Sequence, residues 1–339
     1  MKFYRFPQAD GIDTLALAEA DIPRPAGGQV LVRMRAASLN FRDLMVASGR
    51  YGRGTAPANL VPLSDGAGEV VEIGADVTRV KPGDRVAGIF MQSWMGGEIS
   101  PEDPPSSLGG AINGVLSEYM LFDQHGLVQL PAHLSYEEGA TLPCAAVTAW
   151  NALFGGKPLI AGQSVLVLGT GGVSIFALQL ARAAGARVIA TSSSDAKLDQ
   201  AKKFGASDGV NYRQHPEWHE QVLALTDGRG VDHVVEVGGA GTLPRSIEAA
   251  RLGGNIHLIG VLTGGEINPT PMMRKTLTVR GIYVGSRQMF EAMNRSIELH
   301  NIQPVIDRVF DFAEAKAAYH HLTGQSHVGK VVIRIADAG

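Results

Sequence analysis

The stretch "LGTGGVS" at residues 168–174 joins an apolar run to a segment with helical periodicity. The run that ends in it, "SVLVL" (164–168), predicts a buried strand, and residues 173–186 repeat apolar side chains at the spacing of one helix face. Glycines in such a turn let backbone N–H groups approach a pyrophosphate at the N-terminus of the following helix. The strand-turn-helix context favours a dinucleotide-binding turn over an ordinary tight turn.

Strands and helices continue to alternate after this turn. Residues 187–192, 231–239 and 255–262 predict further strands, with helical stretches between some of them. The alternation indicates the α/β class with a doubly wound parallel sheet. We interpret "TLTVRGIYVG" (276–285) as a long apolar strand at the edge of this sheet. An unprotected edge of that kind tends to pair with another chain, which predicts a homodimer.

The first third of the chain has a different rhythm. Short β-branched runs bounded by Gly, Pro and Asp predict a strand-rich barrel or sandwich, and these runs are residues 29–39, 66–74 and 84–90. One short helix is expected in residues 40–49, because Phe41, Leu44 and Met45 have helical spacing. Residues 93–114 are rich in Gly, Pro and Ser and predict a long surface loop.

The composition excludes several classes of partner. The 339 residues are 45% hydrophobic, which suffices for two domain cores. The 30 basic and 33 acidic residues are interspersed and give a net charge near -3, so we expect neither nucleic acid nor a membrane surface as partner. We find no signal-peptide core and no bilayer-spanning apolar run, which predicts a cytoplasmic protein. Cys144 is the only cysteine, which excludes an intrachain disulfide and a multi-cysteine zinc site.

Five motifs give the chain a wider resemblance. They are "GAGEVVEIGADVTRVKPGDRV" (66–86), "LPCAAVTAWNAL" (142–153), "VLVLGTGGVS" (165–174), "AKKFGA" (201–206) and "HVGKVVIRI" (327–335). Through them nearly the whole chain resembles the medium-chain dehydrogenase/reductase superfamily, specifically its zinc-free quinone oxidoreductase-like and alcohol dehydrogenase-like members. The resemblance implies an NAD(P)H-dependent oxidoreductase with a GroES-like barrel domain and a Rossmann domain. We expect the barrel in residues 1–128 plus 291–339, and the Rossmann dinucleotide-binding domain in residues 129–290.

The resemblance also identifies where a metal would be held. In zinc-dependent members a Cys, a His and a second Cys bind the catalytic ion, and the matching positions here are Asn40, Ser64 and Cys144. Asn and Ser are poor zinc ligands beside thiolate and imidazole, and one cysteine cannot hold the ion. The four-cysteine structural zinc lobe of those enzymes is replaced by residues 93–114. We therefore expect no metal, and we interpret Cys144 as an inert packed residue.

Without zinc, hydrogen-bond donors must polarise the substrate oxygen, and one well-placed donor contributes about 3–4 kcal/mol. The candidate catalytic residues are Asn40, Arg42, Asp43 and Tyr51, the last at the place where the resembling reductases have a tyrosine facing the substrate. Two alternatives stay open: the Tyr51 hydroxyl could be solvated in a turn, and Arg42 could pair with Asp43 on the helix surface. The candidate pocket residues are Phe90 and Trp94 in "IFMQSWMGG" (89–97).

The expected cofactor is NADPH in preference to NADH. In NAD-specific folds an acid about 20 residues beyond the glycine turn binds the ribose hydroxyls and repels a 2′-phosphate, and by alignment with the family Ser192 takes that place. The alternative is that "SSSDAK" (192–197) caps a helix, with Ser194 as the N-cap, and that Asp195 reaches the ribose. The full set of expected cofactor-binding residues is Thr148, Gly169, Thr170, Gly171, Gly172, Val173, Ser192, Ser193, Ser194, Lys197, Tyr212, Gly238, Gly260, Val261, Gly285 and Lys330.

These observations favour a zinc-free NADPH-dependent reductase of quinones, enones or related carbonyls, because such acceptors delocalise the developing charge. Two other interpretations stay open. One is a zinc-independent alcohol dehydrogenase that acts mainly in the oxidative direction. The other is a cofactor-binding protein without turnover. No motif identifies the substrate, which we expect to be a small molecule.

Overall fold

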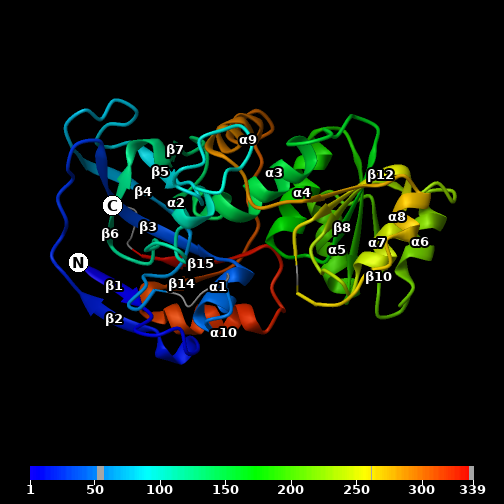
Figure 1. Ribbon diagram of the computed structural model, residues 1–339, viewed down its shortest axis with the longest axis horizontal. Coiled ribbons are helices and arrows are strands. Elements are labelled where there is room, and N and C mark those ends of the chain that lie inside the picture. Colours follow the sequence, from blue (N-terminus) through cyan, green and yellow to red (C-terminus); the bar gives the residue numbers. More distant parts are fainter. Residues whose placement is uncertain (52–56, 261, 336–339) are drawn as a thin grey trace. The chain divides into compact units, whose positions relative to one another are not determined.

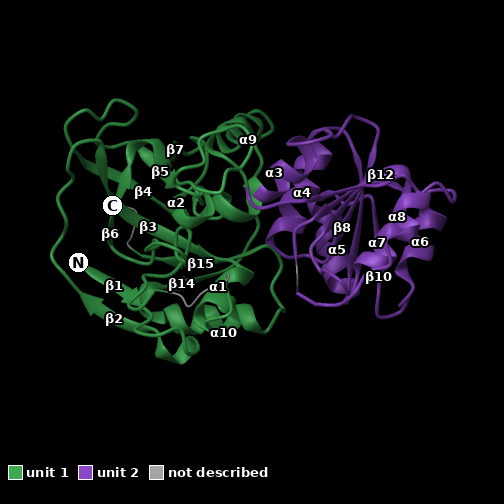
Figure 2. Ribbon diagram, viewed as in Figure 1, with its two compact units in different colours: residues 1–147, 285–339 green, residues 148–284 purple. Residues whose placement is uncertain are grey.

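The computed structural model describes residues 1–51, 57–260 and 262–335. It divides the chain into two compact units, which are residues 1–147 with 285–339 and residues 148–284 (Figure 2). The boundaries differ from the expected ones, because residues 129–147 and 285–290 lie in the first unit. Local hydrogen bonds explain the difference: Cys144 N donates to Asp65, and Arg287 N donates to the carbonyl of Trp94.

The first unit contains a large β-sheet with strand order β14-β15-β3-β4-β5-β7, and β6 also pairs with β3 (Figure 1). A separate two-stranded sheet joins β1 and β2. The strands are β1 (Lys2–Arg5), β2 (Ala16–Glu19), β3 (Gln29–Leu39), β4 (Asp65–Ile73), β5 (Arg85–Gly88), β6 (Tyr119–Asp123), β7 (Leu127–Gln129), β14 (Ile306–Asp311) and β15 (Lys330–Arg334). The strand-rich fold expected for this part of the chain is confirmed.

Helices cover this sheet and connect its strands. They are α1 (Phe41–Ala47), α2 (Tyr136–Gly139), α9 (Arg287–Leu299) and α10 (Ala315–Thr323), with short helical turns η1 (Ile12–Thr14), η2 (Pro104–Ser106), η3 (Gln124–Gly126), η4 (Leu142–Ala146) and η5 (Phe312–Glu314). The core lies between the sheet and α10, where Phe6, Met34, Leu39 and Tyr319 are buried together. The short helix expected in residues 40–49 is confirmed as α1.

The second unit is built on a parallel sheet with strand order β10-β9-β8-β11-β12-β13. The strands are β8 (Ser164–Leu168), β9 (Arg187–Ser192), β10 (Asp208–Asn211), β11 (Val231–Glu236), β12 (Ala250–Leu258) and β13 (Thr278–Gly281). The helices are α3 (Val147–Phe154), which begins at the last residue of the first unit, α4 (Gly172–Ala183), α5 (Asp195–Phe204), α6 (Trp218–Leu225), α7 (Leu243–Ala249) and α8 (Thr270–Arg274). The doubly wound sheet predicted by the alternation is confirmed.

Two local expectations were wrong. Residues 276–285 do not form a long apolar strand, because β13 covers only Thr278–Gly281 and most of its side chains are exposed. Residues 93–114 are not simply a surface loop, since Trp94 and Leu108 are buried and Leu108 N donates to the carbonyl of Phe90 at 3.0 Å. In both places tertiary contacts, and not local composition, decide which side chains are covered.

Candidate active site

Three strand ends of the first unit bring the candidate catalytic residues together. In the antiparallel pairing of β3 with β4, Ser38 lies opposite Asp65, and in the pairing of β3 with β15, Leu39 lies opposite Val331. The end of β3 therefore meets the beginnings of both neighbouring strands. Asn40, Asp65 and Lys330 become neighbours there although they are far apart in the sequence. Leu63, two residues before Asp65, has a φ of 69°, a conformation that a leucine rarely adopts.

The amine of Lys330 is the centre of this arrangement. Its Nζ donates to the carbonyl of Leu39 and, at 2.6 Å, to Oδ1 of Asn40, and it lies 4.0 Å from Oδ2 of Asp65. The side chains of Lys330 and Asp65 are only 3% and 0% exposed. Burial lowers the pKa of the Lys330 amine, while the Asp65 carboxylate opposes this shift. Burial raises the pKa of Asp65, and the charge of Lys330 opposes it.

The same carboxylate also organises the segment that carries Cys144. Oδ1 of Asp65 accepts a hydrogen bond from Ser64 Oγ at 2.6 Å, and Oδ2 accepts one from Cys144 N at 3.1 Å. Cys144 lies in η4, a single π-helical turn, a feature that is frequent at functional sites. Burial, reinforced by the nearby Asp65 charge, raises the pKa of the Cys144 thiol. A thiol whose pKa is raised in this way is a poor nucleophile and a poor metal ligand.

The donor set at the three family metal positions does not fit zinc. Asn40 Oδ1 accepts from the Lys330 amine, and the Ser64 hydroxyl donates to Asp65. The Lys330 amine takes the Asn40 oxygen that a cation would need, and an amide and a hydroxyl are poor zinc ligands beside thiolate and imidazole. In the part of the chain that the structure describes, no group of three or more His, Cys, Asp or Glu side chains could hold a metal.

Asp43 stabilises the beginning of α1. Its Oδ2 accepts a hydrogen bond at 2.7 Å from the backbone N of Asn40, the N-cap residue, as in one half of a capping box. Burial raises the pKa of Asp43 to about 6, against the opposing charge of Arg42. The carboxyl of Asp43 therefore holds the end of the helix that positions Asn40 and Arg42.

Arg42 is a buried cation between two aromatic rings. Its Nη1 donates to the carbonyl of Leu108 at 3.0 Å and lies 3.4 Å from Asp43 Oδ1, so the predicted pair forms, but inside the unit and not on the helix surface. The guanidinium carbon lies 4.3 Å from the Tyr51 ring centroid and 4.7 Å from that of Phe90. Nε and Nη2 are buried, and the Tyr51 side chain is the hydrogen-bonding neighbour of this guanidinium.

The predicted pocket residues lie behind this guanidinium. Phe90 is 1% exposed and packs against Arg42, and Trp94 is buried with its indole N–H donating to the carbonyl of Gly97 at 3.2 Å. Tyr51 is half-buried. The rings of Phe90 and Tyr51 contact the guanidinium and hold it in place.

In the second unit, the glycine turn has the geometry of an open cradle. Gly169 has a φ of 72°, which favours glycine, and Gly171 is the N-cap of α4. A Cβ placed on Gly169 or Gly171 would have no heavy atom within 4 Å. Gly171 has a φ of -74°, so neither its backbone nor a protein neighbour requires glycine there. The open space beside the N-terminus of α4 fits a pyrophosphate group.

Ser174, which replaces the third glycine of the pattern, connects α4 with the end of β8. Its Oγ donates to the carbonyl of Leu168 at 2.6 Å and is buried, as expected for a position that serves helix-to-strand packing. Thr170 is also buried.

The segment after β9 carries the predicted phosphate site. Ser192 is buried, while Ser193 and Ser194 are partly exposed. Ser194 is the N-cap of α5, as the sequence predicts, but its side chain makes no capping hydrogen bond. The Asp195 side chain is held in one position, because its carboxylate accepts hydrogen bonds from Asn211 at 2.7 Å and Gln214 at 2.9 Å.

The other predicted cofactor residues are distributed over both units. Those in the second unit are Thr148, Gly172, Val173, Lys197, Tyr212, Gly238 and Gly260, and those in the first unit are Gly285 and Lys330. Val261 lies outside the described residues. Tyr212 is 41% exposed, whereas Thr148 is buried and the Lys330 amine is engaged with Asn40. Sequence reasoning missed Asp65, which begins β4, and Glu236, which ends β11. For Glu236 the available signal was an acid at the end of an apolar strand.

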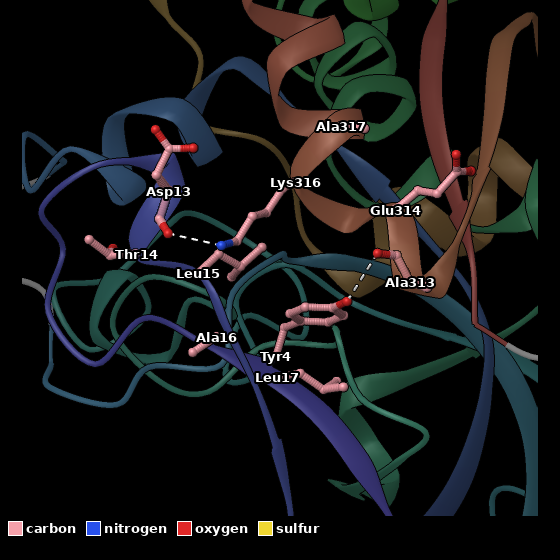
Figure 3. A pocket seen from close by; sticks show the side chains of 10 residues that line it. All are labelled: Tyr4, Asp13, Thr14, Leu15, Ala16, Leu17, Ala313, Glu314, Lys316 and Ala317. Atoms are coloured by element: carbon pink, nitrogen blue, oxygen red, sulfur yellow. Dashed lines mark hydrogen bonds between the residues drawn. The ribbon is translucent and has the colours of Figure 1, made fainter.

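A groove elsewhere in the first unit contains none of the predicted site residues. It measures about 570 Å³ and lies between Asp13–Leu17 and the start of α10, where Lys316 donates to the carbonyl of Asp13 (Figure 3). A second groove, of about 290 Å³, runs beside α5 and β10 and includes Asp195. Neither groove contains the buried cluster around Lys330.

Comparisons with known proteins agree with this geometry. Residues 26–132 match the alcohol dehydrogenase GroES-like domain, and residues 172–298 match the zinc-binding dehydrogenase family. A zinc-type alcohol dehydrogenase-like protein of Schizosaccharomyces pombe is 44% identical, over 99% of this chain and 99% of that protein. A quinone oxidoreductase of Lama guanicoe is 28% identical, over 98% and 97%.

A solved Sinorhizobium meliloti structure, provisionally assigned to the alcohol dehydrogenases, is 40% identical with a TM-score of 0.91, over 98% of this chain and 99% of that one. Among the described residues, no helix has both the length and the apolar character needed to cross a membrane. The fold confirms the expected GroES-like and Rossmann architecture. The chain belongs to the medium-chain dehydrogenase/reductase family, of alcohol dehydrogenase and quinone oxidoreductase type, and is an oxidoreductase of an NAD(P)-dependent family.

Proposed function

We propose that the protein is a metal-independent reductase that uses NADPH to reduce quinones, enones or related carbonyl compounds. The observation that carries this proposal is the Lys330 amine, 2.6 Å from Asn40 Oδ1 and 4.0 Å from Asp65 Oδ2, at the place where the family holds its metal. A lysine amine cannot act as the Lewis acid that zinc provides. The substrate oxygen must then be stabilised by hydrogen-bond donors.

Arg42 is the strongest candidate donor. A bound nicotinamide would supply the hydride, and the chain must stabilise the negative charge that develops on the substrate oxygen. The guanidinium of Arg42 is permanently charged, and its buried donors Nε and Nη2 lie beside the Tyr51 side chain. The rings of Tyr51 and Phe90 hold it in one position, so that little reorganisation is needed during the reaction. The Tyr51 phenol, whose ring lies next to the Arg42 guanidinium, is the candidate proton donor.

Three features support NADPH over NADH. Serines and not an acid follow β9, so no side chain there repels a 2′-phosphate. The one neighbouring acid, Asp195, is held by Asn211 and Gln214. The Ser194 hydroxyl is not used for helix capping, and it lies at the N-terminus of α5, where an anion is favoured. Lys197 on the same helix adds a positive charge.

The test combines metal analysis with a substrate panel. Purified protein is expected to contain no stoichiometric zinc and to oxidise NADPH in the presence of a quinone or enone, with chelators leaving the rate unchanged. The Lys197→Gln variant is expected to lower kcat/KM for NADPH and leave that for NADH nearly unchanged.

Each other outcome favours a different interpretation. One zinc per chain would overturn the metal-independent mechanism. Activity only with alcohols would favour a zinc-independent alcohol dehydrogenase, and cofactor binding without turnover on any substrate would favour a binding protein.

We also propose a homodimer through the outer edge of β13, which ends the strand order of its sheet. Ile282 is buried within its own unit, so a change there would disturb the fold itself. Val279 is 37% exposed on β13 and is the better probe. Val279→Lys is expected to shift the mass measured by light scattering from dimer to monomer. A wild-type monomer at micromolar concentration would contradict the proposal.

A further inference from the structure

The parallel sheet reverses its winding direction between two neighbouring strands. From β8 the chain winds outward through β9 to β10, whereas β11, on the other side of β8, is followed outward by β12 and β13. In open α/β sheets a ligand binds beyond the carboxyl ends of the strands at such a reversal. The two strands concerned end at Leu168 and Glu236. The glycine turn after Leu168 forms one wall of this crevice, so the segment after Glu236 must form the other.

Glu236 is a fully buried carboxylate that ties this second segment together. Its Oε1 accepts hydrogen bonds from Gly238 N at 2.7 Å, Gly239 N at 3.1 Å and Thr242 Oγ1 at 2.6 Å. Its Oε2 accepts one from Ser246 Oγ, in α7. One carboxylate therefore fixes both the turn of residues 237–242 and the helix that follows it.

A second set of contacts connects this turn with the one after β12. Thr263 Oγ1 accepts from Gly241 N at 2.7 Å and donates to the carbonyl of Gly238 at 3.2 Å. Gly260 approaches so closely that a Cβ there would lie 1.6 Å from the Val237 carbonyl oxygen. The turns after β11 and β12 thus form one connected structure, with Glu236 at its base.

We propose that Glu236 is a positioning residue for the dinucleotide: it holds residues 237–242 in the conformation that receives the cofactor opposite the glycine turn. This inference rests on the proposed NAD(P)H function of the site. Glu236 does not touch the cofactor itself, because its carboxylate is buried and occupied by four donors.

A carboxylate suits this arrangement, because both of its oxygens accept hydrogen bonds. All four partners are hydrogen-bond donors, and an ionised carboxylate offers acceptors alone. A glutamine of the same size would keep its oxygen on Gly238, Gly239 and Thr242 only if its NH2 group faced Ser246, whose hydroxyl would then have to turn and accept. The turn would then lose hydrogen bonds to a charged group, which are stronger than neutral ones, and would have to be ordered again when the cofactor binds.

The experiment measures NADPH binding by nicotinamide fluorescence without any substrate. Glu236→Gln is expected to raise the Kd for NADPH about tenfold or more, to leave kcat at saturating NADPH within a few fold, and to increase hydrogen exchange in residues 237–242. Thr242→Val removes one donor and is expected to give a smaller increase in Kd.

Asp232 provides a matched control on the same strand. It is a buried carboxylate in β11 near the opposite end, bound to Ser164, Arg229 and Arg251. Asp232→Asn is expected to lower the melting temperature but to leave the Kd for NADPH within about twofold. The proposal is overturned if Glu236→Gln and Thr242→Val, like the control, lower the melting temperature and leave the Kd for NADPH unchanged. If Glu236→Gln fails to fold, the Kd values of Thr242→Val and Asp232→Asn for NADPH test the proposal.

The two proposals fail in different ways. A wild-type protein that binds NADPH but reduces nothing would contradict the proposed reductase and leave the role of Glu236 standing. A wild-type protein that binds neither NADPH nor NADH would overturn both.

Discussion

Each unit buries a pair of ionisable side chains next to each other, and the two pairs differ in kind. In the first unit the side chains of Asp65 and Lys330 are buried together at the strand ends. In the second unit, two imidazoles are buried within the sheet: His233 Nδ1 lies 3.0 Å from His257 Nε2, and His233 Nε2 lies 3.1 Å from Gln163 Oε1.

The pKa values follow this difference. Burial lowers the pKa of His233 to about 4 and that of His257 to about 3, so both are neutral at physiological pH. The second unit therefore avoids buried charge at this position of its sheet. The first unit buries an amine and a carboxyl 4.0 Å apart, where burial lowers the pKa of Lys330 and raises that of Asp65 while the charge of each partner opposes the shift. Burying two ionisable groups together is costly and is frequent at functional sites, and the following experiments test this contrast.

The largest effect is expected from Lys330→Met. Removing the ammonium leaves the buried Asp65 carboxylate without its counter-charge, and breaking a buried pair in this way costs about 3–5 kcal/mol. The loss should appear as a lower free energy of unfolding in urea. The double variant Lys330→Met with Asp65→Asn should recover most of this loss. A single variant as stable as the wild type would show that the buried pair is not important.

A slightly smaller effect is expected from Arg42→Met, which removes the proposed donor and keeps much of the side-chain volume. Loss of one such donor lowers kcat by about 10²–10³-fold. The melting temperature should fall as well, because Arg42 is the counter-charge of the buried Asp43 carboxyl and contacts the rings of Tyr51 and Phe90. The kcat is therefore compared at a temperature where the variant is folded, and an unchanged cofactor Kd serves as the control. Arg42→Lys keeps the charge without the planar fork and should recover only part of the rate. An unchanged kcat in Arg42→Met would remove this residue from the mechanism.

The third prediction concerns how the free energy of unfolding depends on pH, which differs between the two units. The folded imidazoles of His233 and His257 have pKa values of about 4 and about 3, below the value of about 6.5 in an unfolded chain. The unfolded chain then binds more protons, and stability falls as the pH decreases from 6.5. Between pH 7 and pH 5 this amounts to roughly 2 kcal/mol for each imidazole.

Asp43 in the first unit changes the free energy of unfolding in the opposite direction. Its folded pKa is raised to about 6, above the unfolded value near 3.8, so the folded chain binds more protons and its stability rises as the pH decreases through 6. The variant His233→Gln with His257→Gln should therefore remove or reverse the loss of stability between pH 7 and pH 5. Urea titrations at both pH values measure this, and an unchanged pH dependence would assign the loss to other groups.

The sequence predicted those parts of the site that depend on local patterns. The glycine turn, the short helix at Phe41–Ala47 and the doubly wound sheet all follow from periodicity and turn residues. It could not predict that Lys330 meets Asn40, because that contact depends on the register between β3 and β15. Glu236 was missed for a similar reason: an acid at the end of an apolar strand is informative only once the strand order is known.

The smallest effect, and the sharpest contrast with zinc-dependent relatives, is expected at Cys144. In those relatives a cysteine at this position holds the metal, so its loss would abolish activity. Here the backbone of Cys144 makes hydrogen bonds, its N–H to Asp65 and its carbonyl from Val147 N, and burial raises the pKa of its thiol. Cys144→Ala keeps these backbone contacts and should change kcat/KM by less than about threefold, since the deleted thiol costs only a little packing, about 1 kcal/mol or less. The wild-type thiol should also react with iodoacetamide far more slowly at pH 8 than a free cysteine does, because the thiolate is the nucleophile. Complete loss of activity in Cys144→Ala, with restoration by added zinc in the wild type alone, would contradict a metal-independent site.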